Sequence, residues 1–164
     1  MIRSFAIRAT TLAVALSTLA RVESAHARPR PDNDNFFFAT EILEPLFADK
    51  QQTFGATTEI GDPTTCSGNS SSVWYAYTPE VDELVRADTF GSKYDTTLSV
   101  YVGELLDELD EVACNDDAVD SQSELAFEAT AGVTYFFMVA AFSGEQGGFM
   151  RFHFEVIADD MAAG

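Results

Sequence analysis

The sequence is poor in lysine and strongly biased toward acidic residues. It holds nine lysine and arginine residues against 27 aspartate and glutamate residues, which gives a formal net charge of −18. Lysine occurs only as Lys50 and Lys93. A field of this sign repels nucleic acid and anionic membranes, so we expect neither as a partner. It favours cations or basic partners, and it also suits a solvated surface that binds nothing.

No apolar run in the sequence is long enough to cross a bilayer. The run from Thr10 to Ala20 is shorter than the roughly 20 residues that a membrane-spanning helix needs. Arg3 and Arg8 precede it, and Ala25-His26-Ala27 gives the small-x-small pattern of a signal-peptidase site. We therefore predict a signal peptide over residues 1–27, cleavage near Ala27, and secretion to the periplasm or the medium without a membrane span.

The rest of the chain has the length of one domain. Residues 28–35 form a polar, proline-rich lead-in. We expect a single β-sandwich domain over residues 36–158 and a C-terminal tail over residues 159–164.

The scarcity of histidine limits the possible catalytic chemistry. Ser-His-Asp and Cys-His arrangements need a histidine base, and His153 is the only histidine after the predicted signal peptide. Strand alternation places it on an outer face, between Arg151 and Glu155. We predict no catalytic residues. Paired carboxylates that converge only in space leave a small secreted hydrolase as an alternative.

Only two cysteines occur, Cys66 and Cys114. An even number of cysteines in an exported chain suggests a disulfide. Such a bond closes a long loop, which is worth about 4 kcal/mol in the chain-entropy model. Zinc is a poor alternative because His153 is the only histidine available beside them.

Strand patterns with a period of two recur along the domain. The expected strands cover residues 53–59, 72–78, 83–89, 96–102, 124–129, 133–142 and 150–156. Residues 60–72 read as a loop, and residues 104–111 and 114–123 as acidic connections. Within residues 36–47, Phe38, Ile42 and Leu46 recur at helical spacing, which indicates a short helix that Pro45 limits. The pattern predicts an all-β fold, an antiparallel β-sandwich or jelly roll of about seven or eight strands with a short N-terminal helical or irregular segment.

Five segments occur together in a characteristic order. They are NDNF (33–36), SVWYAYTP (72–79), DTFGSKYDTTLSVYVG (88–103), ACNDD (113–117) and ATAGVTYFFMVAAF (129–142). In this combination the sequence resembles the bacterial pre-peptidase C-terminal domain family over nearly the whole mature chain. The resemblance implies a compact jelly-roll sandwich that serves exported peptidases as a non-catalytic module for secretion, substrate attachment or stability. Some members bind calcium or collagen.

One departure from the family concerns its cysteines. The family often has a cysteine where Phe90 stands, paired with the cysteine of the ACNDD segment. In this sequence the only available partner for Cys114 is Cys66.

Oxygen-bearing side chains gather in two clusters that suit calcium. The lead-in cluster is Asp32, Asn33 and Asp34, and the loop cluster is Asn115, Asp116 and Asp117. Calcium-binding relatives take ligands from an acidic lead-in, which this sequence matches, and from aspartates just before the aromatic strand, where residues 68–72 contain none. The alternative is that these Asn and Asp side chains cap turns through their own backbone. We name all six as candidate Ca²⁺ ligands and expect no other cofactor.

Aromatic and sulfur-containing side chains give a candidate binding surface. Alternation along residues 133–142 places Phe136, Met138 and Phe142 on the face opposite the core. If exposed together, they would bind an extracellular polymer, either protein or polysaccharide, or an exported protein partner. The alternative is that residues 36–47 cover them. We therefore expect a non-catalytic binding or accessory module, with a secreted interaction or inhibitor protein as a further alternative.

Overall fold

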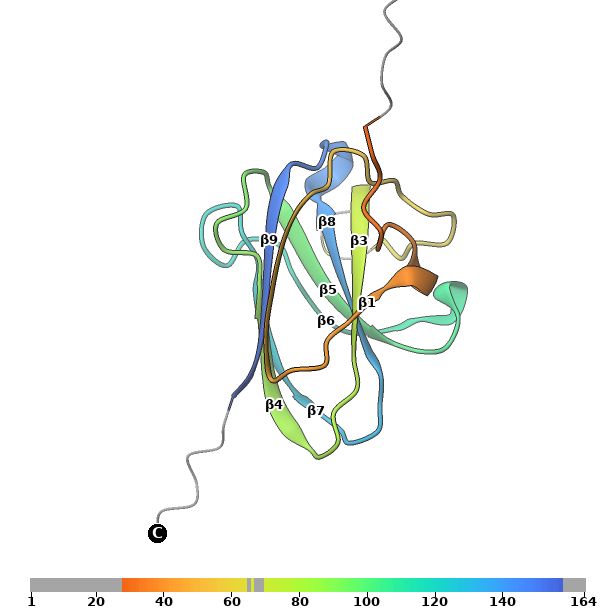
Figure 1. Cartoon of the computed structure of the whole chain (residues 1–164), viewed down its shortest axis with the longest axis vertical. Coiled ribbons are helices and arrows are strands. Elements are labelled where there is room, and N and C mark those ends of the chain that lie inside the picture. The colour runs from red at the N-terminus through yellow and green to blue at the C-terminus, as the bar shows by residue number, and fades with distance from the viewer. Residues whose placement is uncertain (1–27, 65, 67–69, 158–164) are drawn as a thin grey trace, which may run out of the picture.

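The structure, a computed structural model, describes residues 28–64, 66 and 70–157. In this part of the chain two β-sheets pack face to face (Figure 1). In spatial order, one sheet consists of β1 (Thr40–Glu41), β3 (Ser70–Tyr77), β8 (Tyr135–Ala141), β5 (Thr96–Val102) and β6 (Asp110–Asn115). The other consists of β2 (Leu46–Gln52), β9 (Phe149–Ile157), β4 (Glu83–Asp88) and β7 (Glu124–Ala129). The predicted all-β sandwich is confirmed.

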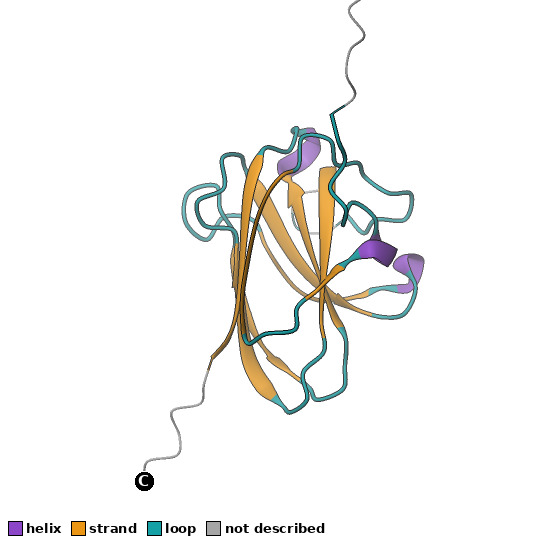
Figure 2. Ribbon diagram, in the orientation of Figure 1, coloured by secondary structure: helices purple, strands orange, loops and turns teal. Residues whose placement is uncertain are grey.

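Strand pairing is antiparallel throughout, apart from the two-residue strand β1, which runs parallel to β3. The helices of the described chain are three short 3₁₀ turns, η1 (Phe36–Phe38), η2 (Leu106–Glu108) and η3 (Phe142–Gly144) (Figure 2). None of these is long or apolar enough to span a membrane. The predicted signal peptide lies outside the described residues.

The main core lies between the two sheets and follows from the period-two alternation. In β9, Met150, Phe152 and Phe154 are buried. Phe152 stacks on Tyr75 of β3 across the sandwich, with ring centroids 4.2 Å apart. Burial of such aromatic rings contributes most of the apolar stabilisation of a small sandwich.

A second, smaller core covers the outer face of the five-stranded sheet. Phe36, Trp74, Tyr101 and Met138 are buried there together, under η1 on one side and the η2 loop on the other. Figure 2 shows these two short helices next to each other. The Phe36 ring lies 5.3 Å from Trp74. The N-terminal segment therefore covers part of this sheet face.

The helix expected within residues 36–47 does not form beyond η1. Phe38 and Leu46 are 69% and 74% exposed, and only Ile42 is buried. The helical spacing of these three residues was therefore coincidental, and the chain runs extended through β1 toward β2.

The strand expected over residues 53–59 is wrong, because the strand lies earlier, at β2. The Thr53 N–H donates to Gly148 O, and the Ala56 N–H donates back to Thr53 O, so the chain turns at this point. Strand β6 was also missed, since residues 104–111 and 114–123 were expected to be connections. None of its side chains is fully buried: the first three are exposed and the last three are partly buried. An edge strand of this kind pairs through its backbone and needs little apolar sequence.

Candidate functional site

Three aspartates meet at one end of the sandwich. Asp95 immediately precedes β5, and Asp116 and Asp117 immediately follow β6. Because β5 and β6 pair antiparallel, with Leu98 opposite Asn115, the start of one strand lies beside the end of the other. Carboxylate oxygens of Asp95, Asp116 and Asp117 lie within 4.8 Å of one another. We call these three residues the acid triad.

Buried hydroxyl groups fix the backbone that carries the acid triad. Ser123 Oγ lies 2.6 Å from the carbonyl oxygens of both Thr96 and Asp116. The hydroxyl groups of Thr89 and Thr96 lie 2.6 Å apart. In Figure 1 the β4–β5 and β6–β7 connections project side by side at this end. The three carboxylates are therefore presented by anchored chain segments.

The electrostatics of the triad oppose ionisation of Asp95. Burial raises the pKa of the Asp95 carboxyl, and the negative charges of Asp116, Asp117 and Glu145 raise it further. One oxygen of Asp95, Oδ1, is buried and has no hydrogen-bond partner. An acceptor that is buried without a donor carries an energetic cost, which a bound cation would offset.

The disulfide predicted from the sequence is confirmed and anchors the same region. Cys66 and Cys114 are bonded, with their Cα atoms 6.1 Å apart. Cys114 lies near the end of β6, so the bond ties the strand that leads into Asp116 to the loop before β3. Such a bond is typical of proteins in oxidising compartments.

The acid triad has the donor chemistry of a hard-cation site. Three carboxylates supply the oxygen ligands that Ca²⁺ and Mg²⁺ prefer, and Ca²⁺ completes its shell of six to eight oxygens with carbonyls and water. The unpartnered Asp95 oxygen fits such an ion better than it fits a network of protein hydrogen bonds.

The lead-in cluster differs from the acid triad, because two of its three side chains are buried and already hydrogen-bonded to the protein. Asn33 donates its amide to Trp74 O at 2.9 Å and accepts from Gln51 Nε2 at 3.1 Å. The Asp34 carboxylate accepts from the Thr57 backbone N–H at 2.5 Å and from the Thr57 hydroxyl at 2.9 Å. These contacts pin the lead-in to the sandwich. Asp32 is exposed.

Of the loop cluster, Asp116 and Asp117 belong to the acid triad, whereas Asn115 accepts the Glu124 backbone N–H at 3.2 Å. Asp95 was not singled out from the sequence. The signal that could have found it is the pairing of β5 with β6, which places the residue before one strand beside the residues after the other. That signal was lost because β6 was expected to be a loop.

The candidate aromatic surface is partly covered. Met138 is buried (1% exposed) in the second core, so it is not available to a partner in this fold. Phe136 is partly buried against Phe36, with ring centroids 4.5 Å apart, and Phe142 is partly buried in η3. Phe36 of the N-terminal segment thus covers part of this face, over Met138 and beside Phe136.

His153 pairs with Asp88: the Nδ1 atom of His153 lies 2.7 Å from the Oδ1 atom of Asp88. The hollow beside this pair has a volume of only about 30 Å³. Both residues lie on neighbouring strands of the four-stranded sheet, and Asp88 also accepts the Phe90 backbone N–H at 2.9 Å. These contacts give the pair a role in joining β4 to β9.

Comparison with known proteins finds distant similarities of fold. A crystal structure of PliG from Aeromonas hydrophila, a periplasmic inhibitor of g-type lysozyme, matches with a TM-score of 0.49 and 13% identity, covering 73% of this chain and 96% of that one. The pre-peptidase C-terminal domain of a Bacillus anthracis collagenase matches with a TM-score of 0.45 and 14% identity, covering 79% and 98%. A family 35 carbohydrate-binding module from an environmental isolate matches with a TM-score of 0.34 and 14% identity, covering 59% and 77%. No protein-family model and no curated protein matches the sequence.

Proposed function

We propose that this chain is a secreted, non-catalytic accessory module of the pre-peptidase C-terminal domain type, and that it binds calcium at the acid triad. The observation that carries the proposal is the convergence of Asp95, Asp116 and Asp117 within 4.8 Å. Asp95 lies in the DTFGSKYDTTLSVYVG segment and the other two in ACNDD, so two of the five segments that carry the family resemblance supply the proposed ligands.

Secretion is supported by the Cys66–Cys114 disulfide together with the predicted signal peptide. Calcium is preferred to magnesium because it accepts irregular ligand sets, including backbone carbonyls and water, whereas magnesium demands near-ideal octahedral geometry. Three clustered negative charges on a chain of net charge −18 also favour uptake of a cation.

The hydrolase alternative uses the same carboxylates, since paired acids a few ångströms apart can act as acid and nucleophile. An enzyme of this kind needs a cleft over its acids to hold the substrate. Hollows of about 520, 590 and 430 Å³ on the described chain are all lined by residues other than the acid triad. This arrangement favours ion binding over hydrolysis.

The test is a thermal unfolding series of the secreted protein in calcium, in magnesium and in sodium chloride at matched ionic strength. Binding to the folded state alone stabilises by about 2.7 kcal/mol at a hundredfold excess over Kd, so we expect calcium to raise Tm by several degrees and magnesium to raise it less. Asp116→Asn should abolish the difference, while the exposed Asp107→Asn, which removes the same charge elsewhere, should keep it. Equal shifts in all three salts, or a hydrolytic activity that Asp116→Asn abolishes, would overturn the proposal.

A further inference from the structure

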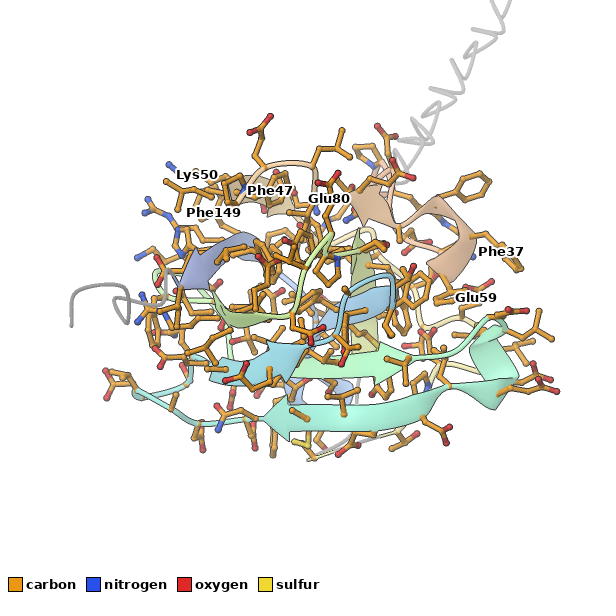
Figure 3. The ribbon with its side chains drawn as sticks, turned by 90° about the horizontal axis from the view of Figure 1, so that it is seen from below. Phe37, Phe47, Lys50, Glu59, Glu80 and Phe149 are labelled. Carbon is orange, nitrogen blue, oxygen red and sulfur yellow. A yellow bond between two sulfur atoms is a disulfide. The ribbon has the colours of Figure 1, made fainter. Side chains whose placement is uncertain are left out.

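A group of large apolar side chains is exposed at one edge of the sandwich. Phe37, Phe38 and Leu43 are 73%, 69% and 80% exposed. All three lie in or next to the short segment that carries η1 and β1. Phe37 projects away from the ribbon in Figure 3. Exposed apolar surface that is concentrated in one place marks a contact site.

A groove of about 520 Å³ runs beside these side chains. Its lining includes Phe36, Phe37, Ile42 and Leu43 from the N-terminal segment, together with Ala76 of β3 and Phe136 of β8. The groove thus lies on the outer face of the five-stranded sheet, next to the second core.

The walls of this groove are held in place by the fold. The Phe36 N–H donates to Glu59 Oε2 at 3.1 Å, and the Ile42 N–H donates to Ala76 O at 2.8 Å. Phe36 and Ile42 are both buried, at 3% and 4% exposure. A preformed groove loses little conformational freedom when it is filled, which favours binding.

A second hollow adjoins the groove. It has a volume of about 430 Å³, shares Glu104, Thr134 and Phe136 with the groove, and is also lined by Val102 and Gly132. Two adjoining hollows on a sheet face suit an extended polypeptide better than one compact small molecule.

The charge of the groove selects among such polypeptides. Glu41 and Glu104 are part of its lining, and neither hollow is lined by a lysine, arginine or histidine. The chain as a whole carries a net charge of −18, so a second copy of the chain or an acidic segment is repelled. Complementary charge raises both the rate and the specificity of association.

We propose that this groove docks an extended segment of a partner protein in which apolar side chains are flanked by lysine or arginine. The apolar side chains contact Phe37, Leu43 and Phe136, and the cationic groups face Glu41 and Glu104. The proposal rests on the proposed role as a binding module and gives that role a partner chemistry.

The test measures fluorescence anisotropy of short labelled peptides added to the intact protein. Three peptides are compared: one alternates lysine with leucine, one glutamate with leucine, and one lysine with serine. We expect binding of the lysine–leucine peptide only, with an affinity that falls as salt is added. Equal binding of the lysine–serine peptide would reduce the effect to charge alone and would overturn the proposal.

Matched variants localise the binding. Phe37→Ser with Leu43→Ser should weaken it about tenfold or more. Ile60→Ser with Val81→Ser changes two exposed apolar positions outside the groove and should leave the binding unchanged. Glu41→Gln with Glu104→Gln should weaken it and flatten its salt dependence, and Glu80→Gln with Glu128→Gln serves as the control of equal charge.

Three results would contradict the docking proposal. They are equal losses in the groove and control variants, binding of neutral polysaccharide in place of the peptide, and a dimer in sedimentation that Phe37→Ser with Leu43→Ser abolishes. Each peptide titration is run with and without calcium. If no peptide binds but calcium still raises Tm, the docking proposal is rejected and the proposed calcium site is retained.

Discussion

The lead-in cluster and the acid triad are built from the same kinds of side chain, but they differ in what their oxygens contact. In the lead-in, Asn33 and Asp34 are buried and their oxygens already accept hydrogen bonds from Gln51 and Thr57. In the triad, three carboxylates face one another and one oxygen of Asp95 has no donor. Composition alone therefore does not distinguish a turn cap from a metal site; the supply of N–H and O–H donors decides.

The largest expected effect comes from cutting the covalent anchor of the triad. Replacing Cys66 and Cys114 with alanine removes a bond between residues 48 apart in sequence, which is worth about 4 kcal/mol in the chain-entropy model. We expect a loss of about this size in urea unfolding, together with a smaller calcium response. An unchanged calcium response in the alanine variant would show that the triad does not need this anchor.

The next largest effect is expected from removing the hydrogen bonds that hold the lead-in. Asn33→Ala deletes the side chain that bonds Trp74 O and Gln51 and leaves a buried carbonyl without that donor, so we expect a loss of about 2 kcal/mol in the free energy of unfolding. Asp32→Ala changes the exposed neighbour and should cost less than about 0.5 kcal/mol. Similar losses in the two variants would mean that the lead-in contributes little to folding.

Asp34→Ala separates the two clusters most sharply. It removes the acceptor for the Thr57 N–H and hydroxyl groups, so we expect a loss of about 1–2 kcal/mol. That loss should be the same with and without calcium, measured by parallel thermal unfolding. A loss confined to calcium-containing buffer would place the ion at the lead-in.

The smallest effect is a change in pH dependence. Because the pKa of Asp95 is raised, the folded state binds its proton more tightly than the unfolded state does. Without calcium, this group therefore lowers stability as pH rises from about 4, the ordinary aspartate value, through the raised value. Asp95→Asn should flatten that fall in Tm. Only part of the slope should disappear, since burial also raises the pKa of Asp62. A profile that is unchanged by Asp95→Asn would contradict the electrostatic account of the triad.

Most of the sandwich was predictable from period-two alternation. Strands β5 and β7 match their expected ranges, 96–102 and 124–129, and β9 is longer by one residue at each end. Alternation succeeded because these strands bury one face in the main core. It failed at β2 and β6, two edge strands in which no side chain is fully buried, so that backbone pairing holds them in place.

The candidate site was predictable only in part, for the same reason. Asp116 and Asp117 stood out as an acidic run, and the pairing of Cys66 with Cys114 followed from the cysteine count. Asp95 became visible only once β6 was known to pair with β5. The burial of Asn33 and Asp34 depends on contacts with residues 51, 57 and 74, which no local pattern encodes.

The most direct test of the account is a crystal structure of the protein grown in calcium, with anomalous scattering used to locate the ion. The account predicts one anomalous peak between the carboxylates of Asp95, Asp116 and Asp117, and none at Asp32, Asn33 and Asp34. A peak at the lead-in, or calcium-dependent stabilisation with no peak at the triad, would contradict it.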